Sequence, residues 1–236
     1  ILVIHSHNAN RGDEAAVKAM VDELLIKYPG AKITISNNGF TSYPGMPENI
    51  IQIDRFPKLE SRMAQLEFFI VLLFKGKFAF TKEARKFIRA LKEADVVLHA
   101  PGGPSIGDTY FKAEKLYLWR LNLIRRMGIP YIFYAPSMGP FNCTSRNKLR
   151  KEVISGAERI VLRDPISVKY VKDFLPGVEV EQALDSALQH DIDIDKNERK
   201  YNNYPELKNF IENHEKCIGI TITDLKWHPV HKNEKI

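Results

Sequence analysis

Short apolar runs that alternate with amphipathic helical patterns constrain the fold of this chain more than any other feature. Such runs predict strands at residues 1–6, 32–36, 50–53, 95–99, 131–134, 159–162 and 178–181. Between them, apolar residues recur at helical spacing and predict helices at residues 13–28, 113–127, 146–157 and 167–175. Strands that alternate with helices form a parallel sheet with right-handed crossovers. The sequence therefore predicts an α/β fold with a doubly wound, mostly parallel sheet of the Rossmann type.

The pattern divides the chain near residue 190. We expect a Rossmann-like amino-terminal domain over 1–190 and a linker or surface excursion over the polar, charged residues 191–216. The apolar stretch Cys217–Thr223 predicts a new buried strand, so 217–236 is expected to begin a truncated second Rossmann-like domain. The chain opens inside its first predicted strand and without an initiator methionine, which is typical of a fragment.

Composition narrows the classes of ligand. The formal charge of +6 favours an anionic partner only weakly, and no nucleic-acid-binding motif accompanies it. Cys143 and Cys217 stand far apart, which is typical of a reducing, cytoplasmic compartment. The seven histidines are scattered, so we expect no metal and no cofactor. His99 ends a predicted strand, where a packed, hydrogen-bonded residue is the more common case.

Ligands of doubly wound sheets bind at the carboxyl ends of the strands. Two glycine-containing loops follow such ends. The first contains Asn10, Gly12 and Asp13 and leads into a helix, whose free N–H groups can bind an anion. Asn10 and Asp13 could equally be helix caps. The second contains Gly102 and Gly103, which permit close approach of backbone to a ligand or form a tight turn. Neither loop is a dinucleotide or P-loop motif.

Further polar residues follow later strands. Ser137 comes after the strand at 131–134, but it lacks the sequence of a nucleophile elbow. Arg146 begins the next helix and is a candidate anion ligand, whereas we expect Arg150 on a solvated helix face. Arg163 and Asp164 follow the strand at 159–162. Asp164 could cap the next helix, and Arg163 is the first candidate for anion binding, because guanidinium groups bind phosphate and carboxylate in pairs of hydrogen bonds.

Residues 55–92 are locally basic, with ten Lys or Arg against three Asp or Glu. They also contain the apolar runs 68–74 and 78–80. Basic, aromatic and aliphatic side chains together could make peripheral contact with an anionic membrane. A buried helix with a solvated basic flank is the alternative that we favour for this segment.

Five short motifs resemble the polysaccharide pyruvyl transferase family in order and spacing: Asn10-x-Gly12-Asp13-Glu14-Ala15, Gly102-Gly103 followed by Asp108, Ser137-Met138-Gly139-Pro140, Arg163-Asp164-x-x-Ser167 and Asp185-x-Ala187. The resemblance implies the amino-terminal half of a two-domain fold similar to GT-B glycosyltransferases. It also implies transfer of the pyruvyl group of phosphoenolpyruvate, as a ketal, onto a sugar of a cell-surface polysaccharide or its lipid-linked precursor.

The implied chemistry assigns roles to the residues above. Arg163 and Arg146 become anion clamps, and the loops at Gly12, Gly102 and Gly103 provide backbone contacts. Asp13 and Asp108 become candidates for catalysis at acceptor hydroxyls, or for helix capping. Pro104 replaces the family's third glycine, and the family's carboxyl-terminal Arg and His would follow residue 236. The alternatives are a GT-B-like glycosyltransferase that uses a sugar nucleotide and a non-catalytic sugar- or nucleotide-binding module.

Overall fold

A computed structural model describes residues 1–7, 10–38, 42–43, 45–57, 61–189 and 194–220 of the chain. Contacts within the chain divide it into two units, Ile1–His190 and Asp191–Ile236. The first unit contains the parallel sheet, and the second contains two short helices.

The main sheet of the first unit is entirely parallel. Its strands are β1 (Leu2–Ser6), β2 (Thr34–Asn37), β3 (Ile51–Ile53), β4 (Val97–His99), β6 (Tyr131–Tyr134), β8 (Arg159–Leu162) and β9 (Glu181–Gln182). They pair in the order β3-β2-β1-β4-β6-β8-β9. β1 lies between β2 and β4, and its Leu2 lies opposite both Thr34 and Val97. This is the strand order of a Rossmann fold, so the predicted fold class is confirmed.

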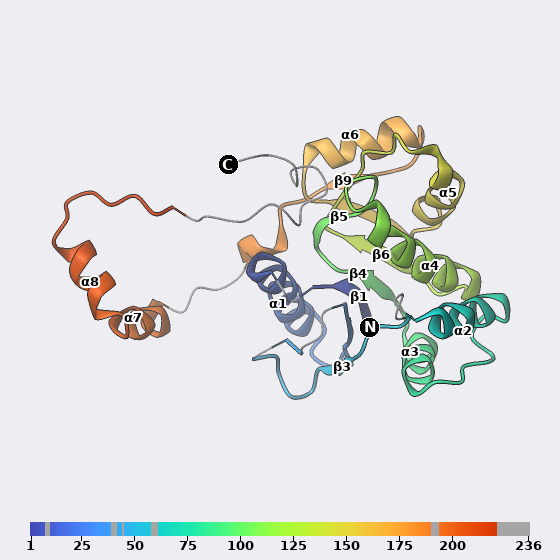
Figure 1. The fold of residues 1–236 in the computed structure, drawn as a ribbon, viewed down its shortest axis with the longest axis horizontal. Coiled ribbons are helices and arrows are strands. Elements are labelled where there is room, and N and C mark those ends of the chain that lie inside the picture. The colour runs from blue at the N-terminus through green and yellow to red at the C-terminus, as the bar shows by residue number, and fades with distance from the viewer. Residues whose placement is uncertain (8–9, 39–41, 44, 58–60, 190–193, 221–236) are drawn as a thin grey trace. The chain divides into compact units, whose positions relative to one another are not determined.

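Helices cover both faces of this sheet (Figure 1). α1 (Arg11–Lys27) packs on one face, where it buries Val17 and Met20 against Val3. The opposite face carries α2 (Arg62–Leu73), α3 (Lys82–Glu93), α4 (Phe111–Met127), α5 (Asn147–Ser155) and α6 (Pro165–Phe174). Burial on both faces explains why the strands are short, nearly continuous apolar runs.

Two strands lie outside the main sheet. β5 (Gly102–Ile106) pairs in parallel with β7 (Pro136–Met138). The prediction of a simple turn or ligand loop at 101–108 was therefore incomplete. The two strands approach closely after β5 ends, because a Cβ on Gly107 would lie 2.6 Å from the Gly139 carbonyl oxygen. Glycine at 107, where φ is +140°, makes this approach available.

Local differences from the expected elements are small at most other places. The strand expected at 178–181 is reduced to Glu181–Gln182, because residues 178–180 pair with no strand. The basic segment 55–92 forms α2 and α3, and α2 buries only one of its two apolar faces. Short 3-10 helices occur at Thr144–Arg146 (η1) and Ser186–Gln189 (η2), and Ser186 Oγ donates to the Ala16 carbonyl of α1 at 2.9 Å.

The second unit differs from the expectation of a linker and a strand. Residues 191–216 contain two helices, α7 (Ile194–Asn202) and α8 (Pro205–Glu212). Of the predicted strand Cys217–Thr223, residues 217–220 adopt no strand conformation and are exposed, because they pair with no other strand. Residues 221–223 lie outside the described residues. The truncated second domain stays a prediction.

A buried polar cluster lies below the carboxyl ends of β1 and β4. The His5 ring contacts His99 and Tyr117 edge-on at centroid distances of 4.6 and 4.5 Å. His99 is packed and hydrogen-bonded, to the Ala100 carbonyl and to Ser105 Oγ, as expected. Burial lowers the pKa of His99 and of His7 to about 4 and holds that of His5 well below 6.5. These imidazoles are therefore neutral in the folded protein at pH 7.

This cluster predicts an acid-sensitive fold. Only the unfolded chain takes up these protons between about pH 6.5 and 4, so stability falls as pH decreases through that window. Each histidine adds a slope of up to about 1.4 kcal/mol per pH unit. Urea unfolding at several pH values should show that the free energy of unfolding of His99→Gln changes less with pH than that of the wild type. The exposed His214→Gln variant should keep the wild-type slope, and equal slopes in all three proteins would contradict this account.

Candidate functional site

The strand order has its switch point between β1 and β4, which is where doubly wound sheets generally bind ligands. The chain leaves these adjacent strands in opposite directions along the sheet, and crevices form at such switch points. Asp13, in the first turn of α1, and Gly102, in β5, meet there. Gly102 has a φ of +147°, and a Cβ on it would lie 3.1 Å from Asp13 Oδ1. Only glycine fits this close approach without strain.

The residues before Asp13 have a structural contact. The Asn10 side chain accepts a hydrogen bond from the Gly12 N–H at 2.8 Å and caps α1. Capping was one of the two interpretations of this loop, and it is confirmed for Asn10. Ligand contact by Asn10 and Gly12 stays a prediction, as does that of Gly103, which lies near the Tyr110 ring.

Arg163 lies after β8 and joins three segments. Its Nε donates to Ser137 Oγ at 2.9 Å, and its Nη1 forms an ion pair with Asp185 Oδ2 at 2.5 Å. Its side chain is 27% exposed, and that of Asp185 is 30% exposed. The predicted residues Ser137 and Arg163 are thus brought together, at an edge that solvent reaches.

Asp164 supports this arrangement. Its Oδ1 accepts from the Ser167 N–H at 2.7 Å, so it caps α6 as one interpretation expected. Its Oδ2 accepts from the hydroxyls of Ser137 and Ser167, both at 2.8 Å. Burial raises the pKa of Asp164, but these hydrogen bonds and the charge of Arg163 outweigh burial and hold that pKa below its ordinary value. Asp164 is therefore a fixed anion behind Arg163.

Asp13 has the opposite electrostatic setting. Burial raises the pKa of its carboxyl; Arg163 lowers it and Asp185 raises it again, with a net upward shift. Asp13, Arg163 and Asp185 are therefore close enough to interact by charge. A carboxyl group with a raised pKa beside a crevice is suited to carry a transferable proton.

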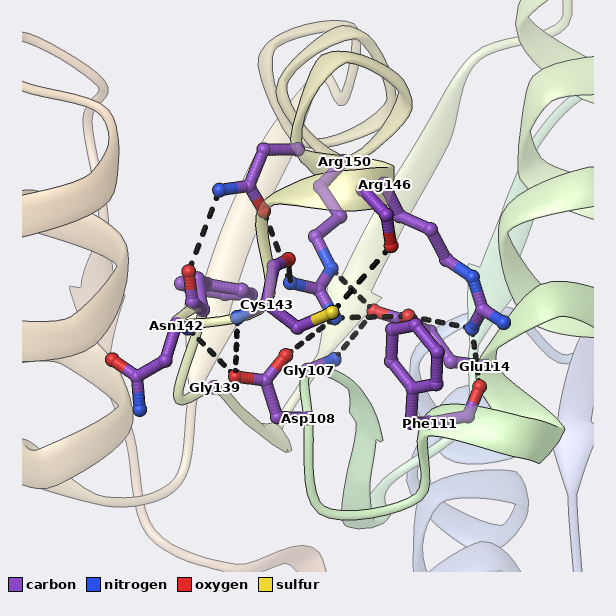
Figure 2. Close-up of polar contacts among 12 residues, drawn as sticks. Gly107, Asp108, Phe111, Glu114, Gly139, Asn142, Cys143, Arg146 and Arg150 are labelled. Atoms are coloured by element: carbon purple, nitrogen blue, oxygen red, sulfur yellow. Dashed lines mark hydrogen bonds and ion pairs between the residues drawn. The ribbon is translucent and has the colours of Figure 1, made fainter.

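Asp108 and Arg146 belong to a second cluster, shown in Figure 2. Its centre is the fully buried carboxylate of Glu114 on α4. Glu114 Oε1 accepts from Arg150 Nε at 2.7 Å and from the Gly107 N–H at 2.8 Å. Glu114 Oε2 accepts from Arg150 Nη2 and from Arg146 Nη1, both at 3.0 Å. Two guanidinium groups thus share one buried carboxylate.

Arg150 is not solvated, contrary to the expectation for this helix face. It is fully buried because Asp108 and Glu114 give it two carboxylate partners. Burial lowers its pKa, but hydrogen bonds and charge from Glu114 and Asp108 outweigh burial and raise the pKa above its ordinary value. Its remaining N–H groups donate to the Cys143 carbonyl and to Asn147 Oδ1, both at 3.0 Å. Arg150 is part of the interior.

Asp108 and Arg146 also have protein partners. Asp108 Oδ1 accepts from Arg150, while Oδ2 accepts from the N–H groups of Asn142 at 2.6 Å and Cys143 at 3.0 Å. Arg146 stacks over the Phe111 ring at 3.7 Å and donates to the Phe111 carbonyl. The side chains are 20% and 22% exposed, respectively. The structure therefore separates the predicted site residues into a partly exposed group around Asp13 and Arg163 and a group whose centre, Glu114 with Arg150, is fully buried.

Sequence reasoning missed several members of both clusters. Glu114 and Arg150 belong to no recognised motif. The available signal was that Arg146 and Arg150 lie in one predicted helix and Glu114 lies in another. Asp185 was quoted in a motif but not named as a site residue. For a metal, the described residues contain no group of three or more His, Cys, Asp or Glu suited to hold an ion.

The sheet order and the helices on both faces of the sheet define an α/β protein of the Rossmann class. The chain belongs to the polysaccharide pyruvyl transferase family, whose model matches residues 10–233. It is accordingly a transferase, with a polysaccharide acceptor implied by the family. No curated protein matches the chain. None of the helices in the described segments has the length and apolar character to cross a bilayer.

The Glu114 cluster predicts a large structural cost for a small change. Glu114→Gln removes the buried negative charge and leaves Arg146 and Arg150 undercompensated. We expect a loss of about 3–5 kcal/mol in the free energy of unfolding. The matched control is Glu152→Gln, which breaks the half-exposed ion pair with Arg125 and should cost no more than about 1 kcal/mol. Urea denaturation measures both, and similar losses would contradict a scaffold role for Glu114.

Proposed function

We propose that the protein transfers the pyruvyl group of phosphoenolpyruvate onto a sugar, as a ketal, at the crevice between β1 and β4. The observation that carries this proposal is that Asp13, a carboxyl with a raised pKa at the Rossmann switch point, lies near enough to the partly exposed guanidinium of Arg163 to interact with it by charge. Family membership supports the type of reaction.

In this proposal Arg163 binds the donor. Phosphoenolpyruvate carries a phosphate and a carboxylate, and both suit the guanidinium group. Among the described residues, the hydrogen bonds of Arg163 use Nε and Nη1, which leaves Nη2 for an anionic group of the substrate. The pair with Asp185 fixes the guanidinium plane before substrate arrives, so little side-chain entropy is lost on binding.

Asp13 supplies the proton. It protonates the methylene carbon of phosphoenolpyruvate, and positive charge develops at C2. One acceptor hydroxyl bonds to C2 as its proton passes to a base. The C2–O bond to phosphate then breaks, inorganic phosphate leaves, and a second hydroxyl closes the ketal with loss of its own proton. A bound anion next to Asp13 raises the pKa of its carboxyl further, which keeps the proton in place until it is transferred.

The remaining predicted residues are proposed to support the reaction. Backbone N–H groups of the loops at Gly12, Gly102 and Gly103 are proposed to contact the substrates. The internal contacts of Asp108 and Arg146 favour a supporting role over direct substrate contact. The acceptor is proposed to be a cell-surface glycan or its lipid-linked precursor. The protein is proposed to act in the cytoplasm, at the inner face of the membrane; the free cysteines Cys143 and Cys217 support a reducing compartment.

Calorimetric binding of phosphoenolpyruvate to the full-length protein tests the proposal. Arg163→Ala should weaken binding by about 10- to 100-fold, because hydrogen bonds to a charged group contribute about 1.5–3 kcal/mol. Arg159→Ala is the matched control, since Arg159 begins β8, the strand that Arg163 follows, and so lies away from its carboxyl end. It should bind as the wild type does.

The outcomes separate binding from chemistry. Asp13→Asn should keep donor binding while phosphate release in the presence of acceptor falls by about 10²–10⁴-fold, the usual contribution of a general acid. Asp22→Asn, an exposed change on the same helix, should leave both unchanged. A wild-type protein that binds a sugar nucleotide and not phosphoenolpyruvate would overturn the proposal in favour of glycosyl transfer.

A further inference from the structure

Helices α2 and α3 (Figure 1) and their connection carry exposed apolar side chains. We call residues 62–93 the α2–α3 surface. Met63, Leu66, Phe69 and Leu73 lie three or four residues apart, so they form one stripe along α2. Met63 is 74% exposed and Phe69 61% exposed. Phe74, Phe78 and Phe80 extend the exposed apolar surface into the connection. Exposed apolar surface of this extent marks an interaction site.

The other face of α2 is already used by the core. Phe68 and Val71 are fully buried, and the Phe68 ring stacks on Trp119 of α4 at a centroid distance of 5.7 Å. The exposed stripe is therefore a second apolar face of α2, separate from the face that packs on the core. A helix that is apolar on both faces and covered on one needs a second apolar environment.

The connection between the helices is held in place. Glu67 Oε1 accepts from the N–H groups of Phe80 at 2.6 Å and Thr81 at 2.7 Å, and its Oε2 accepts from Thr81 Oγ1 at 2.8 Å. The Phe74 and Phe78 rings pack edge to face at 5.0 Å. The exposed aromatic side chains thus project from an ordered turn, and ordering them on binding costs little entropy.

Cations flank the apolar stripe. The α2–α3 surface carries exposed Arg62, Lys75, Lys77, Lys82, Arg85, Lys86, Arg89 and Lys92. Four of them, Lys77, Arg85, Arg89 and Lys92, line a pocket of about 460 Å³ together with Glu93. Of these four, only Arg89 forms an ion pair among the described residues, an exposed 3.3 Å contact with Glu93. The pocket therefore offers positive charge to an anion.

We propose that the α2–α3 surface docks on a membrane that contains anionic phospholipid. The aromatic and aliphatic side chains enter the interface between headgroups and acyl chains, and the flanking cations contact lipid phosphates, one of which occupies the basic pocket. We choose anionic phospholipid as the partner because its negative charge complements the positive charge of the α2–α3 surface. A second copy of the chain would place two strongly basic surfaces against each other, which is unfavourable. The inference stands independently of the reaction proposed above.

Co-sedimentation of the full-length protein with lipid vesicles tests the inference. The protein should sediment with phosphatidylcholine vesicles that contain phosphatidylglycerol and remain in solution with phosphatidylcholine alone. Raised salt should weaken the binding, because the attraction is screened. Arg85→Gln combined with Lys92→Gln should lower the partition coefficient about tenfold or more, and Phe80→Ser should lower it as well.

The controls keep the test decisive. Lys148→Gln combined with Lys172→Gln removes the same charge from exposed positions on α5 and α6 and should bind vesicles as the wild type does. Thermal unfolding should show all variants folded, since each changed side chain is exposed. Equal binding to neutral and anionic vesicles, or unchanged binding by both α2–α3 variants, would overturn the inference.

Two further outcomes would assign the surface to another occupant. If the wild-type protein does not bind vesicles but forms a dimer that Phe69→Ser abolishes, a second copy of the chain is the partner. Absent binding together with a large fall in the melting temperature of Phe69→Ser would show that another part of the full-length chain covers the stripe. Either result overturns membrane docking.

Discussion

The buried carboxylate of Glu114 is the interaction on which the arrangement of the loops depends. It joins the end of β5, through the Gly107 N–H, to Arg146 and Arg150 in the segment that follows β7. Arg150 in turn holds Asp108, and Asp108 holds the backbone at Asn142 and Cys143. A buried ion pair of this kind adds less to stability than it costs when one partner is removed. Its effect here is to fix one geometry among segments that no main-sheet hydrogen bonds connect.

The buried Glu114 cluster supports the partly exposed group around Arg163. β7 leads from Ser137 directly into the segment that Asp108 and Arg150 hold. Ser137 and Asp164 then orient Arg163, which stays 27% exposed. The two clusters contain the same types of side chain but differ in solvent access. Full burial makes Glu114 and Arg150 structural, whereas partial burial leaves Asp13 and Arg163 able to change partners. We propose for this reason that the chemistry takes place at the cluster around Asp13 and Arg163.

The main sheet could be predicted because its signals are local. Buried parallel strands are uninterrupted apolar runs, and β6 and β8 begin and end where the pattern placed them. β5 and β7 escaped prediction since their glycines and prolines are typical of turns and, in the described part of the chain, each pairs only with the other. A strand of this kind is defined by its neighbour and not by its own side chains.

The candidate site was predictable in part. Arg163 and Asp13 follow strand ends, so the general rule for doubly wound sheets found them. Arg150 looked like a solvated position because its partners, Glu114 and Asp108, lie 36 and 42 residues away in the sequence. Asp185 came from a family motif alone, and its contact with Arg163 depends on the path of the chain after β9. Contacts between segments that are distant in the sequence cannot be predicted from the periodicity of apolar residues.

The central claim is that phosphoenolpyruvate binds between Asp13 and Arg163 at the carboxyl ends of β1 and β4. A crystal structure of the full-length protein with phosphoenolpyruvate bound tests it most directly. We predict an anionic group of the ligand within hydrogen-bonding distance of Arg163, with the methylene carbon facing the Asp13 carboxyl. Ligand density at another place, with Arg163 still bound only to Ser137 and Asp185, would contradict the account.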